Sequence, residues 1–460
     1  MPIQSMTSDR TYRVTALSPV HVGTGAQFGK LDSTFQNDKW YLIDLDKVLQ
    51  QQTGAEALTQ DMSRREFAWS WWLRREKISP QKVCAYALPC PTDPLDTPIR
   101  EFIKDPFAQA YLPGSSIKGA LRTVLLWSLL KDNPAALQQT KDYIDLKVQS
   151  RAMLRYMDEQ AHGRYNDRHV HQQMMAAIFD RQRASLLCEA LYQIFGYDAN
   201  RLQRRDFERF AEEKRREPDA RWVDDPIERL IFGNDPNHDL LRALRVSDSS
   251  PLPAENNLEI GIAWIETIRN EKLVPKIEEE QGRRNEHKIF VEWLKTGATL
   301  SVRLNRDNFL FDSAAAEKQL HFRGDQQKAV INLAAACNEF ASMQIETEKK
   351  FFAEYESPEL EAFYADLMKE IPAPESGGFL LRLGWGGGWS NKTIGELLRS
   401  HLDGQKFMAL REYYGLGRKP RSHNAPLQNP FPKTRRIAYE YGDAPAWPLG
   451  WVKFEIGGQA

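Results

Sequence analysis

The stretch from Tyr111 to Leu126, YLPGSSIKGALRTVLL, constrains the fold more tightly than any other part of the chain. Its Pro113-Gly114 pair predicts a turn after a short apolar strand end. Ser115 or Ser116 is well placed to cap a helix, because a Ser side chain accepts a hydrogen bond from the free N–H groups of a first turn. Apolar residues then recur at helical spacing, so the stretch predicts a strand end, a turn and a helix.

Two cations follow the predicted turn. Lys118 and Arg122 stand four residues apart, which places them on one face of the helix. Free N–H groups, the positive end of the helix dipole and these cations form a site for an anion such as a phosphate. An ordinary capped helix with a solvated basic face explains the same residues, so both interpretations stay open.

Length and charge bound the class of protein. The length of 460 residues predicts two or three domains. The 62 basic and 63 acidic residues nearly cancel, so the net charge does not indicate a binding partner. None of the four cysteines, Cys84, Cys90, Cys188 and Cys337, has zinc-ligand spacing, so we expect free thiols in a reducing compartment. We also expect no signal peptide and no membrane span, and hence a cytoplasmic protein.

The periodicity along the chain predicts an α+β fold in three parts. Strands are predicted at 11–17, 39–45, 258–268 and 379–384, a hairpin over 288–304 that turns at Thr296-Gly297, and helices over 325–370 and from about 393 to 402. Glycines 23, 25 and 29 predict a loop between the first two strands. The expected domains are 1–134, a charged helical insertion over 135–245, and 246–460.

The loop GWGGGW at 384–389 lies between a predicted strand and a predicted helix. With the following SNKT it differs from a P-loop by one residue, because Asn391 stands where that motif requires glycine. No apolar strand ending in an acidic residue is evident to hold magnesium, which weakens the nucleotide-hydrolase hypothesis. Backbone N–H groups and Lys392 would bind a phosphodiester by the same physics without hydrolysis.

The segment 411–436 has a strong local excess of positive charge. It contains seven cations and one acid, with Tyr413, Tyr414 and Phe431 interleaved among them. The cations are Arg411, Arg418, Lys419, Arg421, Lys433, Arg435 and Arg436. Such an irregular loop suits single-stranded nucleic acid, and a basic loop that docks on an acidic partner protein is the alternative.

Residues that could carry catalysis are sparse. His169 and His171 lack a third ligand at useful spacing, and we expect no metal and no cofactor. Asp32 is the acidic residue of the first glycine loop, where it either forms a turn or orients a 2′-hydroxyl for RNA cleavage.

Several segments occur in one order: LSPVHVGTG, YLPGSSIKGALR, FGNDPNHDLLRALRVSDSS, LRLGWGGGWSNKTIG and FPKTRRI. This set resembles the RAMP superfamily of CRISPR-associated proteins and, within it, the family of the fifth subunit of type III-A Csm complexes. The resemblance covers about 11 to 440. The helical block around 135–230 carries least of it.

The resemblance implies ferredoxin-like (RRM-like) domains with a large helical insertion and an RNA-binding scaffold rather than an enzyme. It implies a subunit that caps the backbone filament at the 3′ end of the CRISPR RNA and supports maturation of that end in antiviral defence. The implied partners are CRISPR RNA, target RNA, the neighbouring backbone and small subunits, and recruited host nucleases. Cleavage through Asp32 and, behind it, a P-loop-like NTPase are the alternatives.

On this resemblance the two glycine loops, the helix start and the basic segment contact the RNA backbone without reading its sequence. The expected RNA-binding residues are His21, Gly23, Gly25, Ser115, Ser116, Lys118, Arg122, Gly386, Gly387, Gly388, Trp389, Lys392, Arg418, Lys433, Arg435 and Arg436.

Overall fold

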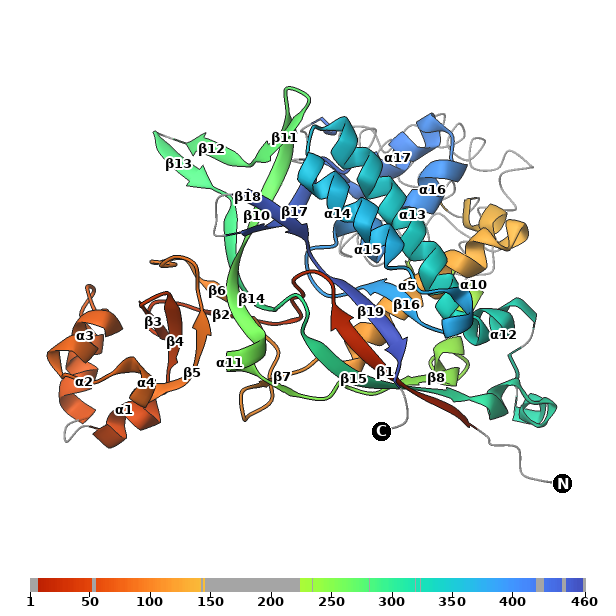
Figure 1. The fold of residues 1–460 in the computed structure, drawn as a ribbon. Coiled ribbons are helices and arrows are strands. Elements are labelled where there is room, and N and C mark those ends of the chain that lie inside the picture. The colour runs from red at the N-terminus through yellow and green to blue at the C-terminus, as the bar shows by residue number, and fades with distance from the viewer. Residues whose placement is uncertain are drawn as a thin grey trace, which may run out of the picture. The chain divides into compact units, whose positions relative to one another are not determined.

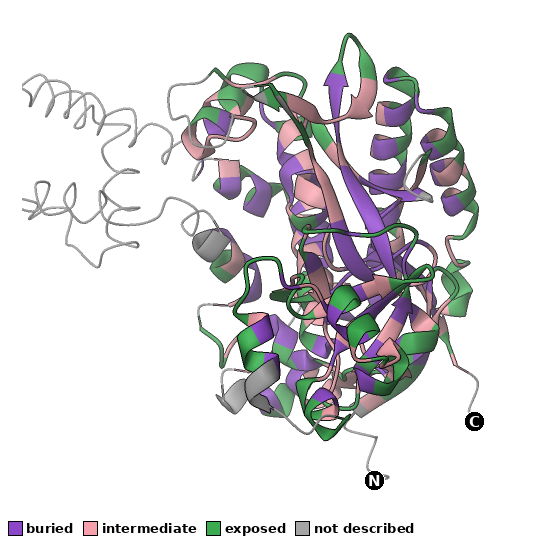
Figure 2. Cartoon of the chain, turned by 90° about the vertical axis from the view of Figure 1, so that its left-hand side faces the viewer, coloured by how far each residue is buried: buried purple, intermediate pink, exposed green. Residues whose placement is uncertain are grey.

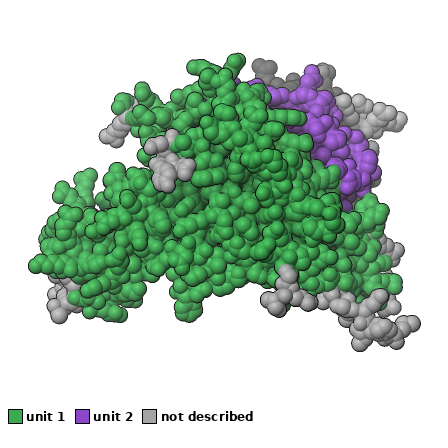
Figure 3. Space-filling view, viewed as in Figure 1, with its two compact units in different colours: residues 1–128, 237–395, 432–460 green, residues 129–236, 396–431 purple. Residues whose placement is uncertain are grey.

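The computed structural model is a mixed α/β protein in which strands form two large sheets (Figure 1). It describes residues 7–51, 55–141, 144, 224–233, 235–280, 282–318, 320–322, 324–418, 426–440 and 444–457. Two compact units are distinguished (Figure 3): residues 1–128, 237–395 and 432–460 form unit 1, and residues 129–236 and 396–431 form unit 2. The predicted domain boundaries stay a prediction, and most of the predicted insertion 135–245 lies outside the described residues.

The first large sheet of unit 1 has five antiparallel strands and contains both ends of the described chain. Its strand order is β16 (Phe379–Arg382), β19 (Trp451–Ile456), β1 (Thr7–Ala16), β15 (Thr299–Asp307) and β8 (Leu244–Val246). Tyr12, Val14 and Ala16 are buried on one face of β1, as the period of two requires for a sheet with one covered face. The strands β1 and β19 lie side by side (Figure 1), with Tyr12 opposite Ile456.

The second large sheet has seven strands. Their order is β18 (Ala444–Pro448), β17 (Thr434–Glu440), β10 (Leu258–Arg269), β14 (Lys288–Leu294), β6 (Ile99–Phe102) and β2 (Gly23–Phe28), and β11 (Lys272–Pro275) pairs with β10. The strand β10 is buried along most of its length, and Figure 2 shows that several strands of the protein are largely buried. Burial on both faces explains why its sequence is almost continuously apolar rather than alternating.

A small lobe within unit 1 precedes β6. It combines a three-stranded sheet, β3 (Ser33–Gln36), β4 (Lys39–Ile43) and β5 (Cys84–Pro89), with α1 (Leu45–Gln51), α2 (Ala55–Met62), α3 (Trp69–Arg75) and α4 (Pro80–Val83). Trp69 and Trp72 are fully buried, and their rings meet edge to face in the core of this lobe. Two-stranded ladders elsewhere pair β7 (Gln109–Ala110) with β9 (Leu252–Pro253) and β12 (Ile277–Glu280) with β13 (Arg283–Glu286).

Helices of the described chain follow the expected pattern in the region 325–370. Three helices occur there: α12 (Gly324–Ile331), α13 (Leu333–Glu354) and α14 (Pro358–Lys369). The others are α5 (Gly114–Lys131), α10 (Asp224–Phe232), α11 (Ala254–Asn257), α15 (Gly388–Lys392), α16 (Gly395–His401), α17 (Gly404–Tyr414) and the 3₁₀ turns η3 (Leu240–Ala243), η4 (Asn308–Phe311), η5 (Ser313–Lys318) and η6 (Pro374–Ser376).

The two large sheets are joined where four chain segments meet, residues 17–22, 295–298, 383–387 and 449–450, here called the sheet junction. Backbone N–H groups of Leu294, Leu383 and Gly450 donate to the carbonyls of Val20, Gly450 and Pro19, at 2.8, 2.7 and 2.9 Å. Gly450 has φ +98°, and a Cβ there would lie 2.3 Å from the Leu383 carbonyl oxygen. The junction therefore depends on backbone approaches that a side chain at that position would block.

The sheet junction corrects two predictions. The hairpin over 288–304 is wrong, because β14 belongs to the seven-stranded sheet and β15 to the five-stranded sheet. Gly297 does turn the chain, at φ +86°, but the turn carries it from one sheet to the other. The first glycine loop is also partly wrong, because residues 23–28 form β2, an edge strand with an irregular register against β6.

Within unit 2, α17 shows clear end signals. The side chain of Asp403 accepts from the Lys406 N–H at 2.8 Å, and Gly415 ends the helix at φ +64°. Such caps satisfy N–H and carbonyl groups that a helix leaves free. The start of the predicted irregular segment 411–436 is therefore the end of a regular helix.

Close packing at Gly261 gives a first test. A Cβ at this β10 position would lie 1.7 Å from the Trp293 ring, so we expect Gly261→Ala to lower the free energy of unfolding by about 1–3 kcal/mol, as overpacked cores do. The matched control is Gly119→Ala on α5, where a Cβ meets nothing within 4 Å. That change should stabilise by about 0.5–1 kcal/mol, because alanine favours helix. Thermal unfolding midpoints that shift equally would contradict the packing at Gly261.

Candidate nucleic-acid interface

Trp385, the first tryptophan of the GWGGGW loop, packs on one face of the seven-stranded sheet. It is half-buried against a cluster of Ala263, Val291, Trp293, Ala438 and Leu449, together with Ile289 and Trp447. Small residues on neighbouring strands leave room for the large rings above them. The tryptophan is therefore held by the sheet and keeps part of its surface exposed.

Two arginines converge on Trp385, and a lysine lies within reach of the charge of one of them. The guanidinium carbon of Arg100, on β6, lies 4.7 Å from the ring centroid, and that of Arg436, on β17, lies 5.1 Å from it. Both distances are within the range of cation–π attraction. Partial burial and the positive charge of Arg436 lower the pKa of Lys392, although that side chain remains exposed as a whole. We call Arg100, Trp385, Lys392 and Arg436 the cationic tryptophan site.

These cations have no counter-charge in the described part of the chain. None of Arg100, Lys392 and Arg436 forms an ion pair there. Burial and repulsion from Arg100 lower the pKa of Arg436, and its Nε is buried without a hydrogen-bond partner among the described residues. Like charges held together favour an anion that neutralises them.

His21 lies behind the site and is part of its support. Its Nδ1–H donates to the Glu292 carbonyl oxygen at 2.7 Å, and its ring meets those of Phe102 and Trp385 edge to face. Burial lowers the pKa of His21 to about 4, and the nearby charges of Arg100 and Lys104 act in the same direction. With 3% exposure, His21 supports the Trp385 ring from inside the protein, and its contact with RNA stays a prediction.

A buried polar network lies beside His21. The Glu292 carboxylate is fully buried, accepts from the Tyr86 hydroxyl at 2.6 Å and from the Phe102 N–H at 2.7 Å, and pairs with Lys104. Each of these charges has a partner, as buried charges require. Lys104 therefore stabilises the fold, whereas Arg100, on β6, forms no ion pair in the described chain.

The glycines of the GWGGGW loop serve mainly to pack it. A Cβ at Gly386 would lie 2.7 Å from Leu449, and one at Gly387 would lie 2.4 Å from Asn391. Gly388 has φ +68° and faces open space, so it is the predicted glycine whose backbone stays accessible. The ring of Trp389 lies against Gly395, where a Cβ would approach it to 2.0 Å.

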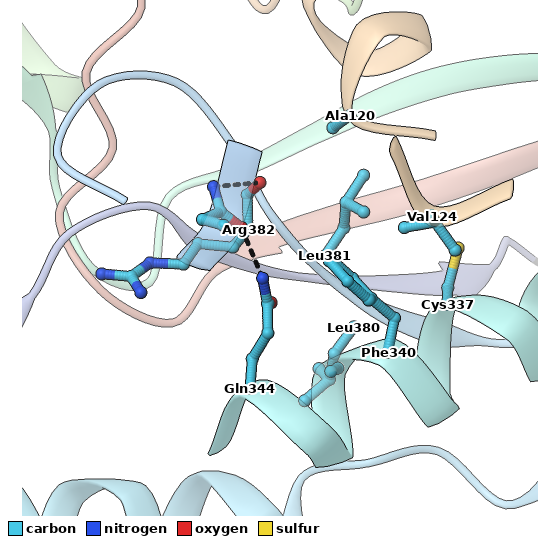
Figure 4. A pocket seen from close by; sticks show the side chains of 10 residues that line it. Ala120, Val124, Cys337, Phe340, Gln344, Leu380, Leu381 and Arg382 are labelled. Atoms are coloured by element: carbon cyan, nitrogen blue, oxygen red, sulfur yellow. Dashed lines mark hydrogen bonds between the residues drawn. The ribbon is translucent and has the colours of Figure 1, made fainter. Parts of the chain in front are cut away.

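Asn391, the residue that departs from the P-loop pattern, holds the loop in place. Gln344 on α13 donates to the Ser390 carbonyl oxygen and to Asn391 Oδ1, each at 3.1 Å. Asn391 in turn donates to the Arg382 carbonyl oxygen at 3.4 Å. Figure 4 shows Gln344 pointing from its helix toward this segment, beside a small pocket lined by Val124, Leu381 and others. The asparagine thus has a structural role in this loop.

The start of α5 differs from the prediction. The helix begins at Gly114, so Ser115 and Ser116 lie inside its first turn rather than at its cap. The N–H of Gly114 donates to the carboxylate of Asp248 at 2.7 Å. The predicted serine cap is therefore wrong, because a residue far along the chain supplies the acceptor.

The two cations of α5 are not equivalent. Arg122 pairs with Asp239 at 2.8 Å, whereas burial lowers the pKa of the half-buried Lys118, against the opposing effect of Asp239. Arg122 and Arg245 repel Lys118 and lower its pKa further. The structure brings Lys118 and Arg122 together with an acidic partner, which weakens this site for an anion.

The cations of the basic segment 411–436 differ in burial and in their partners. Arg435 donates to the buried Glu348 at 2.7 Å and lies 3.7 Å from the Phe351 ring centroid, so it is internal. Arg411 is 3% exposed and donates to Asn429 Oδ1 at 2.7 Å. Lys433 is half-buried in unit 1 and Arg418 half-buried in unit 2, whereas Lys419 and Arg421 lie outside the described residues.

Asp32 forms a turn. Its Oδ2 accepts from the Gly29 N–H at 2.7 Å, and its own N–H donates to the Gly29 carbonyl oxygen at 3.1 Å. Gly25, at φ +94°, faces open space on β2, whereas a Cβ at Gly23 would meet the His21 ring at 2.6 Å. The turn interpretation explains the described contacts of Asp32.

Two members of the cationic tryptophan site were missed by reasoning from sequence. Trp385 lies in the predicted loop but was not singled out, and Arg100 comes after the proline-rich passage, where no strand was predicted. The signal in IREF at 99–102 was weak, because its apolar residues stand at the two ends and do not alternate with polar ones.

The remaining predictions concern the cysteines, a metal site and a membrane-spanning helix. Cys84, Cys90 and Cys337 are free and buried, and Cys188, His169 and His171 lie outside the described residues. Among the residues that the structure describes, no group of three or more His, Cys, Asp or Glu side chains is arranged to hold a metal ion. No described helix is long and apolar enough to cross a membrane.

The sequence and structure of this chain are similar to those of known proteins. A family model described as the RAMP superfamily matches residues 13–391, which is most of the chain. The chain belongs to the RAMP superfamily. This confirms the expected superfamily and its mixed α/β architecture.

The curated relatives are more specific in name but more distant in sequence. One is "CRISPR system Cms protein Csm5" of Streptococcus thermophilus, 26% identical over 137 residues, which cover 25% of this chain and 38% of that protein. A protein of the same name from Methanocaldococcus jannaschii is 27% identical over 240 residues, covering 50% of this chain and 52% of that protein. The matches span about half or less of these relatives, whose name agrees with the expected subfamily.

Solved structures show the fold along the whole chain. A chain of a Csm–crRNA–target RNA ternary complex from a type III-A CRISPR–Cas system matches 97% of this chain and 100% of its own length, with a TM-score of 0.62 and 23% identity. The crystal structure of Csm5 from T. onnurineus matches 96% of this chain and 99% of its own length, with a TM-score of 0.56 and 20% identity. At these identities the likeness concerns the fold.

His21 gives a test of how the site is supported. Its folded pKa of about 4 lies below the usual 6.5, so the unfolded chain binds a proton that the folded chain does not. The resulting stability is fully present above pH 6.5 and is lost as the pH falls toward 4, by about 3 kcal/mol. We expect His21→Asn to flatten the pH dependence of the thermal midpoint over this window, and His401→Asn, at an exposed position, to preserve it. Equal slopes in wild type and His21→Asn would contradict the buried neutral histidine.

Proposed function

We propose that the chain is a non-enzymatic RNA-binding subunit of a type III-A Csm complex, of the Csm5 kind, acting in the cytoplasm. In this proposal it caps the backbone filament at the 3′ end of the CRISPR RNA, supports maturation of that end, and contacts target RNA and the neighbouring subunits. Its sheets would correspond to the ferredoxin-like domains expected of the superfamily. The superfamily membership and the names of the relatives support this assignment.

The observation that carries RNA binding is the cationic tryptophan site. Arg100 and Arg436 lie over one half-exposed indole, Lys392 is close enough to Arg436 to be affected by its charge, and none of the three has an ion-pair partner in the described chain. Cations beside an aromatic ring suit a single-stranded nucleic acid, whose phosphates they neutralise and whose bases stack on aromatic faces. No arrangement of base-reading side chains is needed, which suits a subunit that accepts guides of any sequence.

The salt dependence of RNA affinity tests this site. Arg100→Ala with Lys392→Ala removes two cations, so we expect weaker binding of labelled single-stranded RNA and a salt slope reduced by about 1.4. The loss should be similar for two unrelated RNA sequences, because phosphate contacts do not read bases. Fluorescence anisotropy at several salt concentrations measures both quantities.

The matched control removes the same charge elsewhere. Lys328→Ala with Lys369→Ala replaces two lysines whose side chains are each 76% exposed, on α12 and α14. This variant should keep the salt slope of the wild type. If both double variants reduced the slope equally, the effect would come from net charge and not from the cationic tryptophan site.

Asp32 provides the test of a non-enzymatic role. Because its carboxylate holds the Gly29 turn, we expect Asp32→Asn, assembled into a Csm complex, to leave every target-RNA cleavage product in place. Denaturing gels of labelled target RNA resolve the products. Loss of any one product, with the complex still assembled, would assign Asp32 to cleavage and overturn the scaffold proposal.

A further inference from the structure

A groove on the five-stranded sheet shares no residue with the cationic tryptophan site. It has a cavity volume of about 70 Å³, and its lining includes Arg10, Tyr12, Leu304, Arg306, Ile331 and Phe379, here called the arginine groove. All of these residues belong to unit 1. A cavity of this size accommodates several water molecules or a small aliphatic side chain.

The strand register brings two arginines onto one side of this groove. Arg10 lies opposite Leu304, and Arg306 lies opposite Ser8, so the two arginines are diagonal neighbours on one face of the β1–β15 pair. The Arg10 side chain forms no hydrogen bond or ion pair within the described chain, and Arg306 donates from Nε to the neutral side chain of Asn308 at 2.8 Å. Burial and the charge of Arg10 lower the pKa of Arg306.

Arginines on the opposite face are paired. Arg13 pairs with Glu455 at 3.1 Å, and Arg303 approaches Asp9 to 3.6 Å. Strands β1 and β19 therefore supply counter-charges on the opposite face, whereas no described carboxylate pairs with the arginines of the groove. The arginines of the groove therefore differ from those of the opposite face in having no carboxylate partner in the described chain.

Apolar surface surrounds the unpaired charge. Ile331 is 50% exposed and lines the groove, and Ile456 is 43% exposed. The Ile456 side chain and the Arg10 guanidinium both lie against Gly377. A Cβ at Gly377 would be 2.9 Å from Ile456 Cδ1 and 3.0 Å from Arg10 Nη1. Exposed isoleucines next to arginines are typical of the core of a protein–protein interface, which is rich in arginine and apolar area.

We propose that the arginine groove binds a segment of a neighbouring protein subunit in which an Asp or Glu side chain stands beside an aliphatic side chain. The carboxylate pairs with Arg10 and Arg306, and the aliphatic side chain enters the groove over Tyr12 and Phe379. This inference rests on the proposed assembly of the chain with other subunits, but not on RNA binding.

An RNA strand fits these features less well. Tyr12 is 5% exposed and Phe379 is fully buried, so the groove has no flat aromatic face on which a base could stack. A phosphate needs cations and donors but gains nothing from Ile331 and Ile456. An acidic and aliphatic peptide segment uses both properties of the groove.

Photo-crosslinking within the assembled complex tests the proposal. We would place p-benzoylphenylalanine at Ile331, purify the full-length chain with its coexpressed partner proteins and RNA, irradiate, and identify the crosslinked peptide by mass spectrometry. We expect a peptide of another subunit that contains Asp or Glu beside Leu, Ile or Val. Adding Arg10→Glu with Arg306→Glu should lower the crosslink yield at least fivefold, whereas Arg13→Glu with Arg303→Glu, on the opposite face, should preserve it.

The other outcomes overturn the proposal. A crosslink to RNA would assign the groove to nucleic acid. A crosslink to residues 1–6 of the same chain would mean that the groove binds a segment of its own chain. An assembled complex with no crosslink, or with a yield that ignores the charge reversal at Arg10 and Arg306, would refute the inference alone. Failure of the unaltered chain to purify with any partner protein would refute the proposed assembly as well, so the two failures are distinguishable.

Discussion

The hydrogen bond from the backbone N–H of Trp385 to the His21 carbonyl oxygen, 2.8 Å long, is the contact on which the arrangement of unit 1 depends. It brings the GWGGGW loop onto the crossover that joins the two large sheets. Gly384 makes this approach attainable, because its φ is +71° and a Cβ there would lie 2.1 Å from the same oxygen. One backbone contact thus fixes both the sheet junction and the position of the indole.

Charge near this contact divides into two kinds. Glu292 and Lys104 are buried and satisfied by each other and by neighbouring donors, which is the arrangement that keeps buried charges from unfolding a protein. Arg100 and Arg436 lie on the same sheet, over Trp385, without acidic partners in the described chain. Cations left unpaired at a half-exposed ring, in a fold that pairs its buried charges, are the feature that supports the proposed RNA contact.

Local patterns in the sequence predict local structure and little beyond it. The strand β10 and the helices α12 to α14 follow from periodicity, because period and burial agree there. The hairpin at 288–304 failed because its second strand joins a different sheet, and the serine cap failed because Asp248 replaces it from 134 residues away. Lys392 and Arg436 were predicted from local charge, whereas Arg100 reaches Trp385 only through the strand order of the folded sheet.

The adjacent arginines of the PKTRR segment illustrate this limit. Both carry the same charge, and sequence alone assigns them the same role. On β17 they point to opposite faces, since successive side chains of a strand alternate. Arg435 therefore meets Glu348 and Phe351 in the interior, and Arg436 reaches Trp385. A shift of β17 by one residue would turn each side chain to the other face, so Arg435 would lose Glu348 and Arg436 would leave the Trp385 ring. The register of one strand thus decides which arginine stabilises the fold and which faces the proposed RNA.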